Sequence, residues 1–310
     1  MGIAIRACEL TKYYGTLLAV DHISFEVMEG EFFGFLGPNG AGKTTTIRML
    51  TGLTRPSEGE AYVFGYNILK ETLQAQRLFG VVPEVSNVYT DLTVWDNLMF
   101  MGELYGVSKS ERIERGERLL KLLGLLERRN DRAKGLSKGL KRRLVIAMAL
   151  IHNPKLLFLD EPTSGLDVRS TRTIRNLIRK LNSEGVTVFL TTHNMEEANV
   201  LCDRVAIIYK GKIVTIDTPE RLKQTIQSIQ SVVVSFNNFS KTMREDLKKA
   251  PTVYEVRREG DKFRLYTPDP HTVIEWLCSY VKRKGLKIIS LNTVGPSLED
   301  VYLKLTGGWA

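Results

Sequence analysis

The chain has 310 residues, which is enough for two domains with sizeable cores, and its 43% hydrophobic and 25% charged residues exclude a disordered or fibrous chain. No apolar run approaches the roughly 18 residues that a membrane-spanning helix needs. The net charge of +9 is compatible with nucleic acid, with anionic lipid or with a well-solvated surface, and the absence of any zinc-finger or RNA-binding signature favours the surface.

The cysteines, the histidines and the first residues indicate the cellular compartment of the protein and whether its side chains bind a metal. Cys8, Cys202 and Cys278 are scattered without the spacing of metal ligands, which is typical of reduced thiols. The four histidines are also unclustered, so we do not expect a catalytic metal held by protein side chains alone. Residues 1–6 lack the pattern of a secretion signal, and we therefore expect a protein of a reducing compartment.

The first 35 residues predict β-strands, because apolar residues alternate with polar ones at 3–7 and at 23–27. Tyr14 lies in the turn predicted between two of these strands. An aromatic ring at this place either stacks on an adenine or packs at the end of a strand, and the sequence leaves both interpretations open.

The strongest motif of the chain spans residues 37–45 and fits the phosphate-binding pattern G-x-x-x-x-G-K-[ST]. An apolar run at 31–36 predicts a buried strand before it, and residues 45–50 predict the first turns of a helix after it. Glycines let the backbone wrap around phosphate, and the helix N-terminus adds positive potential. The predicted nucleotide-binding residues of the loop are Gly37, Pro38, Asn39, Gly40, Ala41, Gly42, Lys43, Thr44 and Thr45.

Two side chains of this loop have separate predicted tasks. Lys43 reaches the β- and γ-phosphates of a nucleotide, and the Thr44 hydroxyl holds Mg²⁺. A third polar residue, Glu84, follows a short buried strand that Pro83 ends. Glu84 either faces the phosphate site or is an ordinary solvated carboxylate.

Residues 91–127 predict a long helical insertion with a cap at Asp91 or Thr93. A further helix follows Ser137, which we predict to cap it. The basic cluster 138–143 then lies in the first turns of that helix, where cations are unfavourable unless an anion is nearby. The cluster is therefore either a phosphate contact or a solvated basic surface.

Residues 156–162 form the second acidic motif, in which four apolar residues precede Asp160 and Glu161. The apolar run predicts a parallel strand buried on both faces, and ligands bind at the carboxyl ends of such strands. Asp160 would hold Mg²⁺ through water, and Glu161 would orient and polarise the attacking water. The next strand in sequence ends in His193, which is either structural or within reach of the γ-phosphate.

The character of the chain changes after residue 222. The remaining sequence predicts a small α+β domain without a catalytic cluster, with elements at 231–236, 253–266, 271–284, 286–294 and 297–305. We expect this domain to help two subunits associate or to modulate the chemistry, and a passive structural role is an equal alternative.

Seven segments in this order resemble the nucleotide-binding subunit of ABC transporters, over about residues 3–220. The matching segments are the adenine-stacking aromatic at Tyr14, Walker A at 37–45, the Q-loop at Glu84, the signature at 136–140, Walker B at 156–161, the D-loop at 164–167 and the switch histidine at His193. Within the family, the KRR sequence at 141–143 and the segment 296–302 are similar to the branch of multidrug and antibiotic exporters.

The resemblance implies a fold and a domain organisation. The fold is an α/β P-loop NTPase core with a parallel sheet, an antiparallel β subdomain and a helical subdomain, followed by a small α+β domain. Residues 1–222 would form the ATP-binding domain, with the helical subdomain at about 88–150, and residues 223–310 an accessory domain.

The resemblance also implies an activity and partners. ATP and Mg²⁺ would bind in a homodimer or heterodimer, in which Ser137 and Gly139 of one subunit contact the γ-phosphate held by the other. Lys43, Glu161 and His193 would act in hydrolysis, and Thr44, Glu84 and Asp160 would serve the metal. Closure would drive membrane-spanning permease subunits on separate chains, at the cytoplasmic face of the cell membrane and without nucleic acid.

Two departures from the family pattern leave alternatives open. Glu84 replaces the Q-loop glutamine, and Lys138 replaces the first glycine of the signature. Lys138 either contacts phosphate or hinders dimer closure. A regulatory module with weak turnover therefore remains as an alternative to the exporter subunit. A soluble ABC-type ATPase that acts on ribosomes or DNA is a further alternative.

Overall fold

The computed structural model describes residues 2–225, 230–240 and 242–307. The chain forms two units, Met1–Thr218 and Pro219–Ala310, and each has its own hydrophobic core. The sequence predicted a boundary after residue 222, whereas the short helix α8 (Pro219–Gln224) falls in the second unit.

A six-stranded sheet with the order β10-β9-β3-β8-β7-β6 forms the centre of the first unit. Its neighbours pair in parallel except for β10, which is antiparallel to β9. Every residue of β3, β7 and β8 is buried, as expected for strands covered on both faces. The strands are β3 (Phe32–Leu36), β6 (Phe79–Val82), β7 (Leu156–Asp160), β8 (Thr187–Thr192), β9 (Arg204–Tyr209) and β10 (Lys212–Asp217).

The register of this sheet brings the functional ends of β7 and β8 together. Phe189 on β8 packs with its ring centroid 5.8 Å from that of Phe33 and 5.6 Å from that of Phe158, on the two neighbouring strands. Asp160 at the end of β7 is then paired with Thr191 of β8. The residues that follow both strands therefore emerge at the same edge of the sheet.

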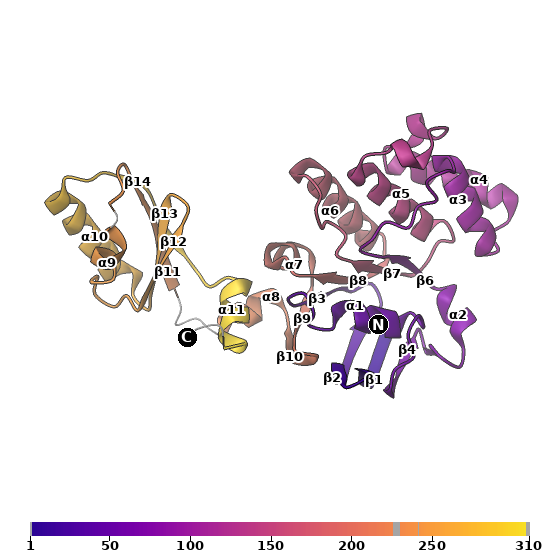
Figure 1. The fold of residues 1–310 in the computed structure, drawn as a ribbon, viewed down its shortest axis with the longest axis horizontal. Coiled ribbons are helices and arrows are strands. Elements are labelled where there is room, and N and C mark those ends of the chain that lie inside the picture. The colour runs from indigo at the N-terminus through magenta and orange to yellow at the C-terminus, as the bar shows by residue number, and fades with distance from the viewer. Residues whose placement is uncertain (1, 226–229, 241, 308–310) are drawn as a thin grey trace. The chain divides into compact units, whose positions relative to one another are not determined.

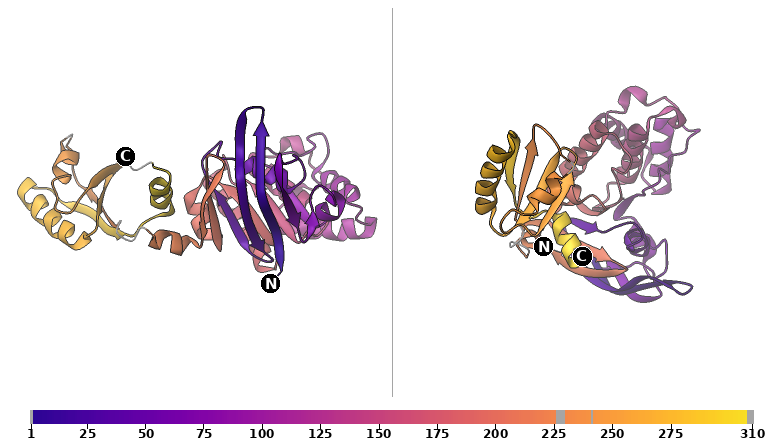
Figure 2. Two further views of the ribbon diagram at one scale, coloured as in Figure 1. Left: turned by 90° about the horizontal axis from the view of Figure 1, so that it is seen from below. Right: turned by 60° about the vertical axis from the view of Figure 1, so that its left-hand side comes forward.

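A second, antiparallel sheet has the order β2-β1-β4-β5. Its strands are β1 (Ile3–Tyr14), β2 (Leu17–Met28), β4 (Glu58–Val63) and β5 (Tyr66–Asn67), and β1 and β2 form the long indigo pair in Figure 2. The inward side chains of this sheet, such as Ile5 and Val27, share a core with Phe33 of the central sheet.

Helices cover one face of the central sheet of the first unit, and α1 lies between the two sheets (Figure 1). Figure 1 shows α3 to α6 on one side of the central sheet and the antiparallel sheet on the other, and α1 contacts strands of both sheets. The helices are α1 (Lys43–Leu50), α2 (Thr72–Gln76), α3 (Val94–Leu104), α4 (Lys109–Leu122), α5 (Lys138–Leu150), α6 (Val168–Ser183) and α7 (Met195–Leu201).

The caps of these helices follow from the sequence. Thr93, one of the two predicted caps of α3, accepts a hydrogen bond from the backbone of Asp96. Ser137 caps α5 as predicted, because its side chain accepts from the backbone N–H of Leu140. Both caps fix where the helical insertion and the signature segment begin.

The second unit is an α+β fold built on a four-stranded antiparallel sheet with the order β12-β13-β11-β14. Helices α9 and α10 cover one face of this sheet, where Leu277 and Tyr280 pack against Val234 and Phe236 (Figure 1). Its further elements are β11 (Gln230–Phe236), α9 (Met243–Leu247), β12 (Glu255–Glu259), β13 (Lys262–Thr267), α10 (Pro270–Lys284), β14 (Ile288–Val294) and α11 (Leu298–Leu305).

The predicted fold class is confirmed, because the parallel core, the antiparallel sheet, the helical insertion and the terminal α+β unit are all present. Within the described ranges, no helix combines the length and apolar character required to cross a bilayer.

Candidate functional site

The phosphate loop lies between β3 and α1, as the motif predicted. Gly40 and Gly42 adopt left-handed backbone angles, with φ of 79° and 109°. A Cβ atom at Gly37 would lie 2.4 Å from the backbone oxygen of Ile208, so only glycine fits there. No side chain caps the first turn of α1, which leaves its N–H groups available for an anion.

Lys43 begins α1, and its side chain lies back across the loop. Its Nζ donates hydrogen bonds to the backbone oxygens of Gly37, at 2.6 Å, and of Pro38, at 3.1 Å. The same atom lies 3.2 Å from Oε1 of Glu161. The Lys43 side chain is only 6% exposed, and the loop and Glu161 hold its ammonium group in place.

Asp160 and Glu161 occupy the carboxyl end of β7, where the sequence predicted them. Oδ1 of Asp160 accepts a 2.5 Å hydrogen bond from the hydroxyl of Thr191. Oε2 of Glu161 lies 2.9 Å from Nδ1 of His193, which follows β8. His193 therefore contacts the carboxylate of Glu161, and its predicted reach to a γ-phosphate stays a prediction.

The second carboxylate oxygen of Glu161 has an unusual environment. Oε1 is buried and accepts no hydrogen bond from any described residue, although it is in ion-pair contact with Lys43. A carboxylate oxygen has two lone pairs, so Oε1 can accept a hydrogen bond from a bound molecule beside its contact with Lys43.

A pocket of about 410 Å³ gathers most of the predicted residues. It is lined by Tyr14, Leu17, Ala19, Pro38, Asn39, Gly40, Gly42, Lys43, Thr44, Thr45, Glu84 and Glu161. Tyr14 ends β1 at the rim of this pocket and is 44% exposed. Of the predicted site residues, Gly37, Ala41, Asp160, His193, Ser137 and Gly139 do not line it.

The residues in and beside the pocket can supply some of the ligands of Mg²⁺, with phosphate oxygens of a nucleotide supplying others. Among the described residues, no group of three histidine, cysteine or acidic side chains could hold a metal by itself. Thr44 and Glu84 line the pocket, and Asp160 ends β7 directly before Glu161, which also lines it. Mg²⁺ commonly binds one or two carboxylates and fills its remaining positions with water and substrate phosphates, so this donor set fits the ion.

Ser137 and Gly139 lie at the start of α5 and pack on another part of the same chain. A Cβ atom at Gly139 would lie 2.5 Å from the hydroxyl oxygen of Ser170 on α6. A Cβ atom at Gly165 would lie 2.3 Å from Nζ of Lys138, so the lysine side chain covers this glycine. The signature segment thus contacts residues 165–170 and leaves its exposed Ser137 outside the chain's own pocket.

Arg142 neither contacts a phosphate site nor lies on a solvated surface, which were the two interpretations of the basic cluster 138–143. Its side chain is buried, and its guanidinium group donates hydrogen bonds to backbone oxygens instead of facing solvent or phosphate. Burial lowers the pKa of Arg142 to about 10, which still leaves the group protonated at neutral pH. Helical spacing places Arg142 on one face with Val145, Ile146 and Ala149, which was the signal for its burial.

Glu197 on α7 is a second residue that the sequence did not single out. Its buried carboxylate accepts hydrogen bonds from Thr163, at 2.9 Å, and from Thr192, at 2.9 Å, and it pairs with Arg175 at 3.1 Å. These contacts join Thr163, which follows β7, to Thr192 at the end of β8. Glu197 therefore fixes the two loops from which Glu161 and His193 project.

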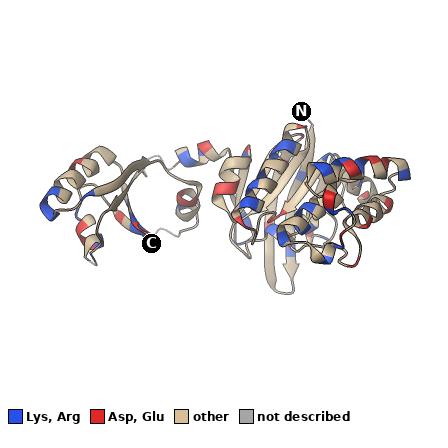
Figure 3. Ribbon diagram, turned by 90° about the horizontal axis from the view of Figure 1, so that it is seen from above, with Lys and Arg blue, Asp and Glu red and all other residues tan. Residues whose placement is uncertain are grey.

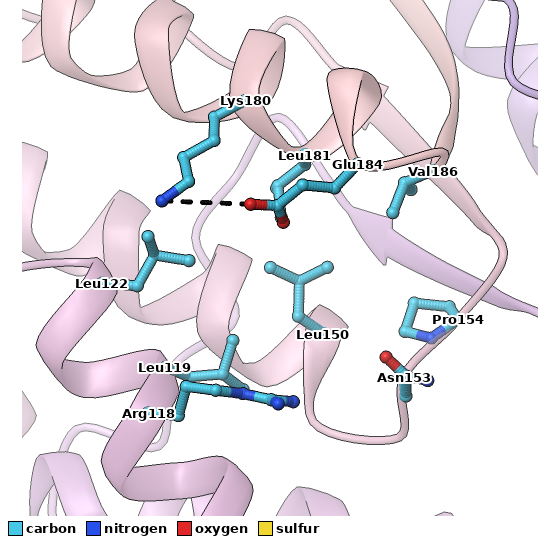
Figure 4. Close-up of a pocket in the computed structure, with 10 residues that line it drawn as sticks. All are labelled: Arg118, Leu119, Leu122, Leu150, Asn153, Pro154, Lys180, Leu181, Glu184 and Val186. Atoms are coloured by element: carbon cyan, nitrogen blue, oxygen red, sulfur yellow. Dashed lines mark ion pairs between the residues drawn. The ribbon is translucent and has the colours of Figure 1, made fainter.

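A separate pocket of about 440 Å³ lies among α4, α5 and α6 (Figure 4). Leucines 119, 122, 150 and 181 line it, and the Lys180–Glu184 ion pair, at 3.9 Å, lies at its edge. It contains neither the phosphate loop nor the paired carboxylates, so it is distinct from the candidate nucleotide site.

Comparisons with known proteins agree with this geometry. The family described as ABC transporter matches residues 20–164. The linearmycin resistance ATP-binding protein LnrL of Bacillus subtilis is 36% identical over 305 residues, which is 98% of each chain. The Nod factor export ATP-binding protein I of a Rhizobium species is 38% identical over 305 residues, which is 98% of this chain and 97% of that protein.

A solved structure extends the comparison to the fold. It is a dimeric, post-hydrolysis state of an ATP-binding cassette bound to ADP and Pi, with a TM-score of 0.63 and 28% identity. The match covers 69% of this chain and 98% of the cassette. With close to full-length relatives above 30% identity, the chain belongs to the ABC transporter family as an ATP-binding, ATP-hydrolysing subunit.

Proposed function

We propose that this chain hydrolyses ATP to power a membrane exporter of drugs or other small hydrophobic compounds. The observation that carries the proposal is the pocket in which Lys43 of the phosphate loop faces Glu161 at the end of β7. The name of one relative supports the export direction, since it is a Nod factor export protein, and another relative is named for linearmycin resistance.

The proposed nucleotide site uses the pocket along its whole length. Tyr14 stacks on the adenine, while the backbone of residues 37–45 and the Lys43 ammonium hold the phosphates. Thr44 and Glu84 hold Mg²⁺ together with Asp160, which acts through water. When bound, Mg²⁺ neutralises part of the charge on the phosphate oxygens.

The proposed hydrolytic step follows from the environment of Glu161. Oε1, which accepts no hydrogen bond from the described residues, orients a water molecule and takes its proton as the water oxygen bonds to the γ-phosphorus. The bond between the γ-phosphorus and the β–γ bridging oxygen breaks, and the electron pair leaves with ADP. His193 holds the other carboxylate oxygen, and the Lys43 ammonium, which contacts Glu161 in this structure, binds the phosphates of ATP.

The proposed active state is a dimer. Ser137 and Gly139 are not part of their own chain's pocket, so we place them over the nucleotide of a second ATP-binding subunit in a head-to-tail pair. ATP that bridges two subunits binds the closed state better than the open state and thereby shifts the population towards closure. The second unit of the chain, which forms its own core, would assist this association or modulate turnover.

We place the membrane partner at a groove between α2 and α3. This groove has a volume of about 420 Å³, and Leu73 and Leu104 at its edges are 73% and 63% exposed. Large apolar side chains with this exposure indicate a surface that another chain covers. We propose that a cytoplasmic helix of the permease occupies this groove, because α2 and α3 flank the Glu84 loop in sequence and would relay its movement. The subunit would then lie at the cytoplasmic face of the membrane.

Hydrolysis and membrane capture test this function together. We expect the purified chain to release phosphate from ATP with Mg²⁺ present and to lose this activity with excess chelator. In membranes from the native host, the parent chain should sediment with the membrane fraction, and Leu104→Glu should shift to the supernatant with unchanged ATP binding. Sedimentation with ribosomes or DNA would support the soluble-ATPase alternative. ATP binding without Mg²⁺-dependent turnover, even with membranes present, would support the regulatory alternative.

Figure 3 adds an argument against a nucleic-acid partner as the leading choice. Basic and acidic residues alternate along α4 (Figure 3). The charged residues of α6 are all basic, but Arg175 and Lys180 pair with Glu197 and Glu184, and Arg179 donates to the backbone oxygen of Val200. Binding to the phosphate backbone of nucleic acid depends on a concentrated basic surface.

The unusual Lys138 leads to a separate prediction about closure. Its ammonium group lies at the exposed start of α5, beside the proposed contact with the partner's γ-phosphate. If its charge assists closure, Lys138→Gly and Lys138→Met should both weaken the ATP-dependent dimer about two- to fivefold, which is the scale of an exposed charge contact. Light scattering across a protein dilution series measures this. Tighter association in Lys138→Gly alone would instead show that the side chain hinders closure.

A further inference from the structure

We propose that Arg142 is a positioning residue that ties the backbone of Glu161 and the Glu84 loop to the helix that carries the signature. The inference deepens the proposed function and rests on it. Arg142 touches neither the proposed nucleotide nor the attacking water, and it acts through the two segments that do.

The guanidinium group of Arg142 joins two segments that are far apart in sequence. Nε donates to the backbone oxygen of Pro162 at 2.7 Å, and Nη2 donates to those of Asp160, at 3.0 Å, and Glu161, at 2.6 Å. Nη1 donates to the backbone oxygen of Pro83 and, at 3.3 Å, to that of Glu84. One side chain therefore binds backbone oxygens of the Walker B end and of the Q-loop at the same time.

These bonds matter because the backbone at Glu161 is strained. Glu161 has φ of 47°, in the left-handed region that residues other than glycine rarely adopt. Such a conformation persists only where the surrounding structure holds it. Arg142 binds the carbonyl groups of Glu161 and of both its neighbours, so it fixes the peptide planes from which the carboxylate reaches Lys43 and His193.

The same side chain connects these segments to the proposed dimer contact. Arg142 and Ser137 belong to one helical segment, in which Ser137 is the cap of α5. Five residues of helix span about 7.5 Å and move as a rigid piece. A displacement of α5 when Ser137 engages the partner's nucleotide is therefore transmitted through Arg142 to Glu161 and to the Glu84 loop of the same subunit.

Lysine cannot replace arginine in this role. A guanidinium group presents five N–H donors in a planar fork, whereas a lysine ammonium presents three donors at a single point. Arg142→Lys keeps the positive charge but cannot reach both segments at once. Arg143 offers a matched control, because it is the next residue of the same helix and its Nη1 donates, at 3.4 Å, to the backbone oxygen of Leu123 in the helical insertion.

The test compares Arg142→Lys with Arg143→Lys in the full-length chain. We expect Arg142→Lys to lower kcat about ten- to a hundredfold, the scale of a misplaced catalytic group, while KM and the Kd of a fluorescent ATP analogue stay within about threefold. Arg143→Lys should keep kcat within about twofold. In a Glu161→Gln background, Arg142→Lys should reduce the residual hydrolysis by less than about twofold, because residues that act as a unit are not additive.

Several results would overturn the proposal. One is an unchanged kcat in Arg142→Lys; another is a full, additive loss in the Glu161→Gln background; a third is an equal loss in Arg143→Lys. Arg142→Gln, which removes the buried charge and keeps an amide donor, repeats the test if the lysine variant does not fold.

Amide hydrogen exchange tests the role of Arg142 independently of ATP hydrolysis. A parent chain that does not hydrolyse ATP even with membranes present would contradict the ATPase itself. In that case faster amide exchange in residues 80–86 and 158–164 of Arg142→Lys, relative to Arg143→Lys, is still expected. Equal exchange in the two variants would show that Arg142 does not hold these segments.

Discussion

Glu161→Gln is expected to lower kcat for ATP hydrolysis about a hundredfold or more, because a positioned general base contributes that much to proton transfer. Glutamine keeps the size of the side chain and can still contact His193, so ATP should bind as in the parent. The amide cannot take a proton from water at neutral pH. The variant should therefore hold ATP without consuming it and accumulate as an ATP-bound dimer.

Phosphate release measures hydrolysis by the variant, and light scattering in the presence of ATP measures its dimerisation. Glu184→Gln is the control, since its carboxylate lies outside the nucleotide pocket and is about half exposed in its pair with Lys180. The control should match the parent in both assays. Hydrolysis by Glu161→Gln at more than half the rate of the parent would rule out Glu161 as the general base.

Local patterns were sufficient to predict the elements that carry the chemistry. The glycine spacing at 37–45 predicted the turn between β3 and α1, and the apolar run before Asp160 predicted the buried strand β7. Caps at Thr93 and Ser137 were also predictable, because a capping side chain and the N–H groups it binds lie within one turn. Short helices such as α9 (Met243–Leu247) were not predicted, because five residues are too few to show the periodic spacing of apolar residues that indicates a helix.

Contacts between distant segments could not be derived in the same way. The ion pair of Lys43 with Glu161 and the bonds of Arg142 to the Glu84 loop depend on how strands and helices pack in space. Charge position alone suggested that the cluster 138–143 faces phosphate or solvent. Arg142 is instead buried, and its guanidinium group binds backbone oxygens of two loops. No sequence pattern identifies backbone oxygens of distant loops as the partners of a side chain.

Lys43→Met is expected to weaken ATP binding and, independently, to destabilise the nucleotide-free protein. Loss of a charged hydrogen-bond donor to phosphate should raise the Kd for ATP about ten- to a hundredfold. The side chains of Lys43 and Glu161 are only 6% and 8% exposed, so methionine leaves a buried carboxylate without its cation. Breaking one partner of such a pair typically costs about 3 kcal/mol or more of unfolding free energy.

Two further variants separate these effects. Lys180→Met removes a lysine whose side chain is 57% exposed and lies 3.9 Å from its carboxylate, so both ATP affinity and stability should be nearly unchanged. The double variant Lys43→Met, Glu161→Gln should regain part of the stability, because a neutral amide tolerates burial better than an unpaired carboxylate. Urea unfolding of the nucleotide-free protein, followed through amide exchange of the strand Leu156–Asp160, reports on the unit that contains the pair. If Lys43→Met destabilises this strand no more than Lys180→Met does, the buried pair does not stabilise the empty site, and Lys43 acts on bound phosphate alone.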